Sequence, residues 1–340
     1  MRKNICAVRL LAACLAVLTA ILALPGCQRE ITVKNRVFYE YFDTVSTVYD
    51  YSGGSEAEFL ENVELVRSSL ERYHRLFDIY NEYDGMNNIA TLNRMAGEWV
   101  EIAPELLEFL DYAVGMHELT GGNMNIAMGS VLSIWHRYRE VGKSVPTMAE
   151  LRAAAEHTDI TKLELDRAGG RARLLDPEMS LDVGAIAKGY ATERIAAFLI
   201  AKGVSSYVLD VGGNLRAIGS KPDGSTWRTG VKNPNIYDFD TPYVEYLDVK
   251  DTSVVTSGDY QRFYVVDGVS YHHIIDKDTL MPADYFASVT ISTGDSGLAD
   301  ALSTALFTMD YESGMALAST IDDITVVWVT KDGEVLKLGE

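Results

Sequence analysis

The sequence predicts an α+β fold in which helices pack on a mixed β-sheet core. Three observations favour this class. Helical periodicity dominates the first half of the chain, strand and turn patterns dominate from residue 206 to about 291, and neither internal repeats nor long linkers divide the chain. At 340 residues the chain is long enough for one large domain or two interlocked lobes.

The N-terminal residues 1–26 have the composition of a secretion signal. Basic residues precede an apolar stretch at 10–24, and Leu24-Pro25-Gly26-Cys27 follows it. This ending resembles the lipobox of bacterial lipoproteins, in which the chain is cut before the cysteine and Cys27 carries the lipid. The alternative is a single membrane-spanning anchor, but an apolar stretch of about 15 residues is shorter than the roughly 20 that a spanning helix needs.

These features predict a lipoprotein signal peptide at 1–26, a short tether at 27–35 and a folded domain at 36–340. The protein is then anchored by a lipid to the outer side of the bacterial cytoplasmic membrane, on its periplasmic or extracellular face. The cysteines are Cys6, Cys14 and Cys27, all in or beside the leader. Without them, the folded domain can form neither a disulfide nor a cysteine metal site.

The charge of the chain bounds its partners. The formal net charge is −19, which argues against nucleic acid as a partner. An acidic substrate therefore needs a local metal ion or a few well-placed Lys and Arg residues.

In the first half, residues 36–51 alternate apolar and polar side chains in the manner of a strand. Residues 56–80 carry apolar side chains at helical spacing and predict a long amphipathic helix. A second helix begins at Pro104 and ends before Gly121-Gly122, and a third begins near Pro146.

In the second half, residues 181–202 predict a glycine-containing turn that leads into a helix, followed by a short strand at 206–211. Helices are expected at 298–307 and 314–321. Residues 323–338 predict a terminal hairpin around Lys331-Asp332-Gly333.

Two oxygen-bearing residues stand four positions apart on the helix expected at 298–307. Helical geometry stacks Asp300 and Thr304 on one face, where a carboxylate and a hydroxyl can reach one hard cation such as Mg²⁺. An ordinary polar helix face is the alternative, and the spacing alone is weak.

The segment Asp182–Tyr190 predicts a helix entry that can hold phosphate, because unpaired N–H groups and Lys188 place positive charge at the same helix end. It lacks the Walker spacing, and a glycine-relieved turn with a solvated lysine is an equal alternative. His272-His273 can supply a general base, a metal ligand or a core histidine. We discount zinc, because no spaced His/Glu pair of the zinc kind occurs.

The joint order of these motifs resembles the FAD:protein FMN transferase (ApbE) family over nearly the whole mature chain. Each motif alone is ambiguous, but the colinear set is specific. The matching segments are Phe42-Asp43-Thr44, Thr91-Leu92-Asn93, Gly121–Asn125, Leu181–Ala191, Gly212-Gly213-Asn214, Thr256–Tyr260, His273–Asp276 and Ala299–Ala305.

The resemblance implies an ApbE-type, T-fold-like architecture and a definite reaction. A Mg²⁺-dependent FAD:protein FMN transferase splits the FAD pyrophosphate, attaches FMN through a phosphoester to a Thr or Ser of an extracytoplasmic target protein, and releases AMP. The implied partners are flavin-accepting subunits of membrane redox proteins.

The resemblance also implies roles for individual residues. Asp300, Thr304 and the Ala185 carbonyl would hold Mg²⁺. We expect His273 to act as general base or positioner, with Asp259 and Asp276 as less favoured choices. The residues implied to bind FAD are Phe42, Tyr80, Asn93, Asn123, Met124, Asn125, Asp182, Lys188 and Ile274.

Three segments depart from the family pattern. Asn125 replaces an aspartate, Lys277–Leu280 replaces Pro-Arg-Thr-Gly, and Phe42-Asp43 replaces Met-Gly. The altered 277–280 turn keeps open an FAD pyrophosphatase that gives FMN and AMP to water. The change at Asn125 keeps open a flavin-binding lipoprotein without turnover.

Overall fold

The structure is a computed structural model that describes residues 32–339. Val33–Glu340 forms one compact unit, and its first strand begins at Lys34, within the segment 27–35 expected as a tether. The expected signal peptide at 1–26 and the lipid site at Cys27 lie outside the described residues. Among the described residues, no helix combines the length and apolar character that crossing a membrane requires.

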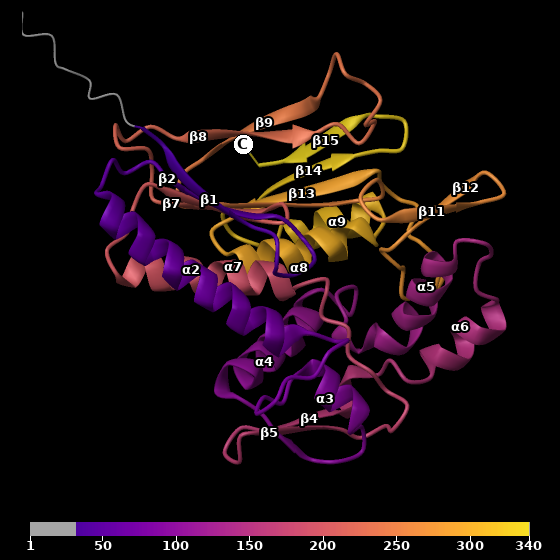
Figure 1. The fold of residues 1–340 in the computed structure, drawn as a ribbon. Coiled ribbons are helices and arrows are strands. Elements are labelled where there is room, and N and C mark those ends of the chain that lie inside the picture. Colours follow the sequence, from indigo (N-terminus) through magenta and orange to yellow (C-terminus); the bar gives the residue numbers. More distant parts are fainter. Residues whose placement is uncertain (1–31, 340) are drawn as a thin grey trace, which may run out of the picture. The chain divides into compact units, whose positions relative to one another are not determined.

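An antiparallel sheet of eight strands forms the centre of this unit (Figure 1). Each strand pairs antiparallel with its neighbours. In order across the sheet, the strands are β1 (Lys34–Phe38), β2 (Ser46–Asp50), β6 (Tyr207–Val211), β7 (Asn214–Ile218), β10 (Ser253–Gly258), β13 (Ser288–Thr293), β14 (Thr325–Val329) and β15 (Val335–Leu338).

Both faces of the sheet are covered, which explains the continuous apolar runs in its central strands. Along β14, Val326 and Trp328 pack with the helices, whereas Val327 points to the opposite face and packs under a hairpin. That hairpin is β8 (Trp227–Lys232) with β9 (Tyr243–Val249), seen above the sheet in Figure 1. The helices below the sheet are α2 (Glu56–Phe77), α7 (Ala187–Ala201), α8 (Ser296–Phe307) and α9 (Tyr311–Ala318).

A second, mostly helical region lies below these helices and to their right in Figure 1. Its small sheet has the order β3-β5-β4. A separate two-stranded hairpin, β11 (Phe263–Val266) with β12 (Val269–His272), stands beside α5. The elements of the region are α3 (Ile89–Arg94), β3 (Val100–Glu101), α4 (Pro104–Leu119), the 3-10 turn Ile126–Met128, α5 (Gly129–Val141), α6 (Met148–Ala155), the 3-10 turn Ile160–Lys162, β4 (Leu163–Asp166) and β5 (Arg171–Leu174).

The α+β class predicted from the sequence is confirmed, and two of the differences in detail concern elements that border the cleft. The single strand expected at 36–51 is two antiparallel strands, β1 and β2, joined by a turn in which the Thr44 N–H donates to the Tyr41 carbonyl at 3.3 Å. Helix α5 precedes the helix expected near Pro146, and the sequence analysis missed it. Both the turn and α5 border the cleft described below.

Helices α7 and α8 pack very closely at Gly189. A Cβ atom added at Gly189 would collide with the Ser296 carbonyl oxygen and with Cβ of Asp300. The missing side chain lets the backbone of α7 approach α8, and the Gly189 N–H donates to Oδ2 of Asp300 at 2.8 Å. This contact brings the start of α7 next to the only described carboxylate on α8.

We expect Gly189→Ala to lower the free energy of unfolding by about 1–3 kcal/mol, because the added methyl group must push α7 from α8. Gly115→Ala is the matched control, since Gly115 lies inside α4 with open space at its Cβ position. There, alanine should raise stability by about 0.5–1 kcal/mol. Urea unfolding followed by circular dichroism measures both, and equal stability of Gly189→Ala and wild type would contradict the packing constraint.

Candidate active site

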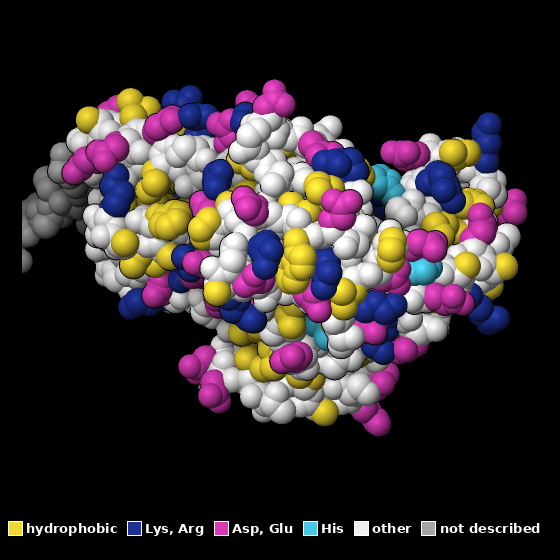
Figure 2. Space-filling view, turned by 90° about the horizontal axis from the view of Figure 1, so that it is seen from below, with side chains coloured by type: hydrophobic (Ala, Val, Ile, Leu, Met, Phe, Trp, Pro, Cys, Tyr) yellow, Lys and Arg dark blue, Asp and Glu magenta, His cyan; other side chains and the backbone are white. Residues whose placement is uncertain are grey.

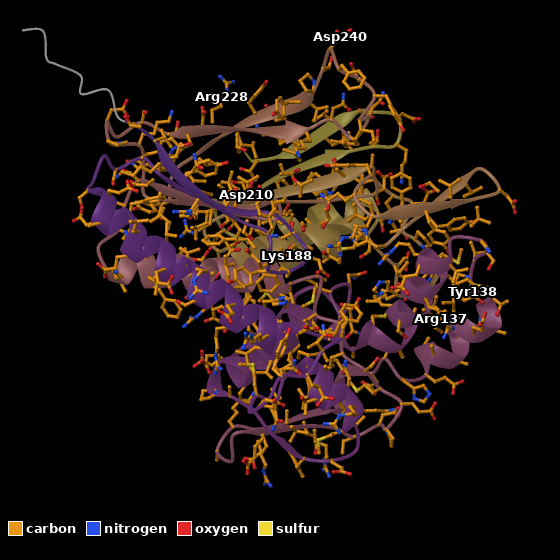
Figure 3. The ribbon with its side chains drawn as sticks, in the orientation of Figure 1. Arg137, Tyr138, Lys188, Asp210, Arg228 and Asp240 are labelled. Atoms are coloured by element: carbon orange, nitrogen blue, oxygen red, sulfur yellow. The ribbon has the colours of Figure 1, made fainter. Side chains whose placement is uncertain are left out.

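A cleft of about 680 Å³ opens between the sheet with its helices and the helical region. Its walls come from the 42–44 turn, the loop after α2, the 122–125 segment, α5, the entry to α7, β10, residues 273–277 and α8. Lys188, labelled in Figure 3, lies at the centre of the molecule where these walls meet.

Most of the residues singled out from the sequence meet in this cleft. They arrive from segments far apart in the chain, which makes their convergence a property of the fold. The predicted residues that line the cleft are Phe42, Tyr80, Asn123, Asn125, Asp182, Ala185, Lys188, His273, Ile274, Asp300 and Thr304.

Two predicted flavin contacts, Asn93 and Met124, are not among the lining residues. Asn93 exchanges two hydrogen bonds with the backbone of Leu181: its Nδ2 donates to the carbonyl at 2.9 Å, and its Oδ1 accepts the N–H at 2.7 Å. Met124 is fully buried in the core. In this structure Asn93 therefore positions the segment that carries Asp182, and Met124 anchors its neighbours Asn123 and Asn125.

Asp300 is a buried carboxylate at the cleft floor. Asp295 caps the N-terminus of its helix, since the Asp295 side chain accepts the Leu298 N–H at 2.8 Å, and Asp300 itself is only 4% exposed. Lys188 Nζ lies 3.6 Å from Oδ2, the oxygen that also accepts the Gly189 N–H. Burial raises the pKa of Asp300, and the Lys188 charge and the Gly189 N–H oppose that rise.

The groups around Asp300 are oxygen donors suited to a hard cation. Thr304 lines the cleft one helical turn further on, with Oγ1 at 3.4 Å from Ser257 Oγ, and Ala185 borders the same space. In the described part of the chain, no group of three or more His, Cys, Asp or Glu residues lies close enough together to hold a metal ion, so any cation here would need other ligands as well. One carboxylate, a hydroxyl and a backbone carbonyl are the ligand types that Mg²⁺ accepts when substrate phosphates and water complete its shell.

The entry to α7 carries positive potential into the cleft. Asp182 stabilises the turn: its Oδ1 accepts the Gly184 N–H at 2.9 Å, and its own N–H donates to the Ile126 carbonyl at 2.8 Å. Burial raises the pKa of the Asp182 carboxyl. Because α7 starts at Ala187 and Lys188 occupies its first turn, the helix dipole and the lysine charge act together on an anion.

His273 is a neutral imidazole held among cations. Burial lowers its pKa to about 3, and His272, Arg262, Arg139 and Lys188 add to this effect. Its Nδ1 is buried without a hydrogen-bond partner among the described residues. The ring itself lines the cleft, and a neutral imidazole in that place can exchange a proton with a bound group.

The neighbouring residues hold His273 in place. His272 is a core histidine, because its Nε2 donates to the Ala283 carbonyl at 2.8 Å and its Nδ1 accepts the Ile274 N–H at 3.2 Å. Asp276 accepts the Asp278 N–H at 2.7 Å and so organises the following turn. Asp259 pairs with Lys331 at 2.9 Å and does not line the cleft, which leaves His273 as the best placed of the three candidate bases.

The three departures from the family pattern have local explanations. At Asn125, Nδ2 donates to the Thr158 carbonyl at 3.0 Å while Oδ1 accepts the Ala127 N–H at 2.9 Å. An aspartate could not make the first bond, so the amide ties the cleft wall to the segment before β4. Phe42 and Asp43 both adopt left-handed backbone, with φ of 57° and 49°, which a glycine at the second position would adopt without strain.

Leu280 also adopts a left-handed conformation, with φ of 60°, at the position where the family pattern has glycine. Its side chain is buried with Met128, Val131 and Trp135, and its carbonyl accepts the Trp135 Nε1–H at 2.9 Å. Apolar burial thus offsets the backbone strain, and the atypical turn remains attached to α5.

Several residues of the cleft wall were not expected from the sequence, namely Asp78, His136, Arg139 and Arg262. Tyr80 OH lies 2.7 Å from His136 Nδ1, and Asp78 accepts the Tyr80 N–H at 2.8 Å, so the aromatic wall is tied to α5 and to the end of α2. Arg139 and Arg262 also line the cleft. None of these belongs to a recognisable motif, and only the fold brings them to the site.

The low pKa of His273 predicts a pH dependence of stability. The unfolded imidazole, with an ordinary pKa of 6.5, binds a proton below that pH, while the folded one does so only near 3. Acidification therefore favours unfolding. The contribution of His273 to the free energy of unfolding is fully present above pH 6.5 and is lost as the pH falls below that value. At about pH 5 this loss amounts to about 2 kcal/mol relative to neutral pH, and His273→Gln should lack it.

Urea unfolding of wild type and His273→Gln at both pH values checks this expectation. The difference between the two proteins isolates His273 from the other titrating groups. An identical pH dependence of the two proteins would show that His273 titrates normally in the folded state.

The strain at Leu280 predicts an unusual order of variant stabilities. Both Leu280→Ala and Leu280→Gly lose buried apolar contacts and should be destabilised by about 2–4 kcal/mol. Because glycine adopts positive φ freely, Leu280→Gly should be more stable than Leu280→Ala by about 1 kcal/mol. Thermal or urea unfolding ranks them, and the reverse order would contradict the left-handed assignment.

The chain resembles known proteins along most of its length. The ApbE family model matches residues 42–328. An FAD:protein FMN transferase of Treponema pallidum (strain Nichols) is 32% identical over 311 residues, which cover 86% of this chain and 83% of the relative. One of Vibrio cholerae is 27% identical over 326 residues, which cover 95% of each chain.

Solved structures of ApbE proteins have a similar fold. The ApbE protein of Thermotoga maritima superposes with a TM-score of 0.79 at 28% identity, covering 90% of this chain and 97% of that one. The flavin transferase ApbE of Vibrio cholerae gives a TM-score of 0.73 at 26% identity, with the same coverage. The family match over most of the residues and these similarities establish that this chain belongs to the ApbE family.

Proposed function

We propose that this ApbE-family enzyme is a Mg²⁺-dependent FAD:protein FMN transferase that attaches FMN to a Thr or Ser hydroxyl of an acceptor protein and releases AMP. The observation that carries the proposal is the meeting, in one cleft, of Asp300 and Thr304 with the α7 entry and the neutral His273. Its relatives in Treponema pallidum and Vibrio cholerae are named for transfer of FMN from FAD to protein.

The pyrophosphate of FAD has a natural position at the α7 entry. Lys188 and the N-terminal end of α7 attract its negative charge, and the buried Asp300 faces the same point. Asp300, Thr304 and the Ala185 carbonyl would hold Mg²⁺, which when bound offsets negative charge on the diphosphate and on the departing AMP. Gly189 keeps this constellation compact, since it allows α8 to bring Asp300 against Lys188.

His273 is the proposed general base. The acceptor hydroxyl gives its proton to the neutral imidazole as its oxygen bonds to the phosphorus of FMN, and the bond from that phosphorus to the AMP oxygen breaks. In the free protein, nearby cations contribute to the low pKa of His273. The negative charge of the bound FAD pyrophosphate compensates Lys188, one of these cations, and raises the pKa of His273, so its basicity increases when substrate is present.

The aromatic residues of the cleft are suited to the flat rings of FAD. Tyr80 is fixed by its hydroxyl contact with His136, and the Phe42 ring packs edge-on against His74 at 5.7 Å. Rings held in this way offer a stacking surface without losing further conformational entropy on binding.

The proposed location follows from the leader. A lipid on Cys27 would keep the enzyme at the outer side of the cytoplasmic membrane, next to extracytoplasmic segments of flavin-accepting redox subunits. The acidic and basic side chains on the face seen in Figure 2 are interspersed rather than gathered by sign, so that face has no large basic region for nucleic acid.

The test is incubation of the purified protein with FAD, MgCl₂ and a library of synthetic peptides that each contain one threonine. Mass spectrometry should find FMN joined to threonine, with AMP in equal amount. Asp300→Asn should reduce the rate by about 100-fold or more, because the amide can still accept the Gly189 N–H but lacks the charge. Asp259→Asn makes the same change outside the cleft and should act like wild type.

Other products would point to other functions. Free FMN with AMP and no peptide adduct would identify an FAD pyrophosphatase, and bound FAD that stays intact with Mg²⁺ would identify a flavin-binding protein without turnover. Either result contradicts the transferase proposal.

A further inference from the structure

The β11–β12 hairpin is a free-standing two-stranded sheet beside the cleft. Its strands pair only with each other among the described residues, from Phe263 opposite His272 to Val266 opposite Val269. Each strand therefore has an outer edge that no described strand covers. Such an edge presents backbone N–H and C=O groups that can pair with an additional strand.

Both ends of this hairpin enter the cleft. Arg262 precedes β11, His273 follows β12, and both residues line the cleft wall. A chain that runs along the hairpin is thereby directed to the proposed general base. Proximity of this kind is what a transferase needs, since its second substrate is a polypeptide.

The base of the hairpin is firmly held. Tyr271 stacks on Trp135 of α5, with ring centroids 6.1 Å apart and planes inclined by 26°, and Tyr264 packs on Tyr271 at 5.7 Å. His272 bonds to the Ala283 carbonyl. An edge fixed in this way can receive a strand without being ordered first, which lowers the entropic cost of binding.

The hairpin exposes apolar side chains along its length, from the cleft end to the tip. Phe263 is 43% exposed, Val265 is 52% exposed and Val269 is 53% exposed. Phe263 and Val265 lie two residues apart on β11 and so share one face. Neighbouring exposed apolar side chains beside a free edge mark a surface that a partner can cover.

The cleft end of the hairpin carries unpaired positive charge. Arg262 makes one described hydrogen bond, to the Asp43 carbonyl at 3.5 Å, and neither Arg262 nor Arg139 has a described carboxylate within ion-pair distance. Guanidinium groups bind carboxylates readily. In a chain of net charge −19, this is a local site where a negative group on a partner is accepted.

We propose that the β11–β12 hairpin is the docking site for the acceptor: an extended segment adds as a strand to the hairpin edge, covers Phe263 and Val265, and places its Thr or Ser at His273. A carboxylate close to the accepting hydroxyl faces Arg262. The inference rests on the transferase function proposed above, and it defines the acceptor as an extended, acidic segment rather than a folded surface.

The first test uses a peptide that accepts FMN in the transfer experiment. The double variant Phe263→Ser, Val265→Ser should raise the KM for this peptide about tenfold, because apolar contacts with it are lost. Its FAD affinity, measured by flavin fluorescence, should equal that of wild type. An unchanged peptide KM, or a loss of FAD affinity in parallel, would overturn the docking assignment.

A matched control lies on another hairpin. Tyr237 and Phe239 are 80% and 85% exposed in the β8–β9 loop, next to Asp240, which Figure 3 shows on the opposite side of the sheet from Lys188. Tyr237→Ser, Phe239→Ser removes a larger exposed aromatic surface there and should still leave the peptide KM unchanged. An equal rise of KM in this control would refute a specific role of β11–β12.

Crosslinking provides an independent test with the unaltered protein. The same peptide, with valine in place of its threonine and a photoactivatable residue beside it, should crosslink mainly to residues 262–272. Crosslinks mainly elsewhere would overturn the proposal. Failure of wild type to flavinylate any peptide would instead contradict the transferase function, so the two failures are distinguishable.

Discussion

The close approach of α7 and α8 at Gly189 is the constraint on which the site depends. It brings Lys188, Asp300 and the first turn of α7 to one point, although α8 begins more than a hundred residues later in the chain. A single backbone N–H to carboxylate bond, made in a buried place, fixes their relative position. Because the contact has no room for a side chain, the geometry of the charge centre follows from backbone packing.

Burial then shifts the pKa values of two titratable groups of the cleft, Asp300 and His273, in opposite directions. It raises the pKa of Asp300 and lowers that of His273, so in each case burial disfavours the charged form. A bound cation would compensate the carboxylate, and a bound anion would compensate the cations around the imidazole. A charged substrate with its metal ion would therefore balance the charges of the cleft.

The residues at which this chain departs from the family pattern make local contacts that stabilise the cleft wall. The Asn125 amide donates a hydrogen bond to the Thr158 carbonyl, and the buried contacts of Leu280 offset the strain of its left-handed backbone. Both residues join the helical region to the cleft wall. They hold the wall in position while changing its composition.

The sequence by itself determined the α+β class, most helix positions and the motif residues of the cleft, because helical periodicity and motif order are properties of neighbouring residues. It did not separate β1 from β2, since the turn between them contains aromatic and acidic residues in place of the usual glycine and proline signals. Only the tertiary structure decided that Arg139, Arg262 and His136 face the site and that Met124 and Asn93 do not. Which side chains share a cleft depends on contacts between segments that are distant in the chain, and local sequence patterns do not predict such contacts.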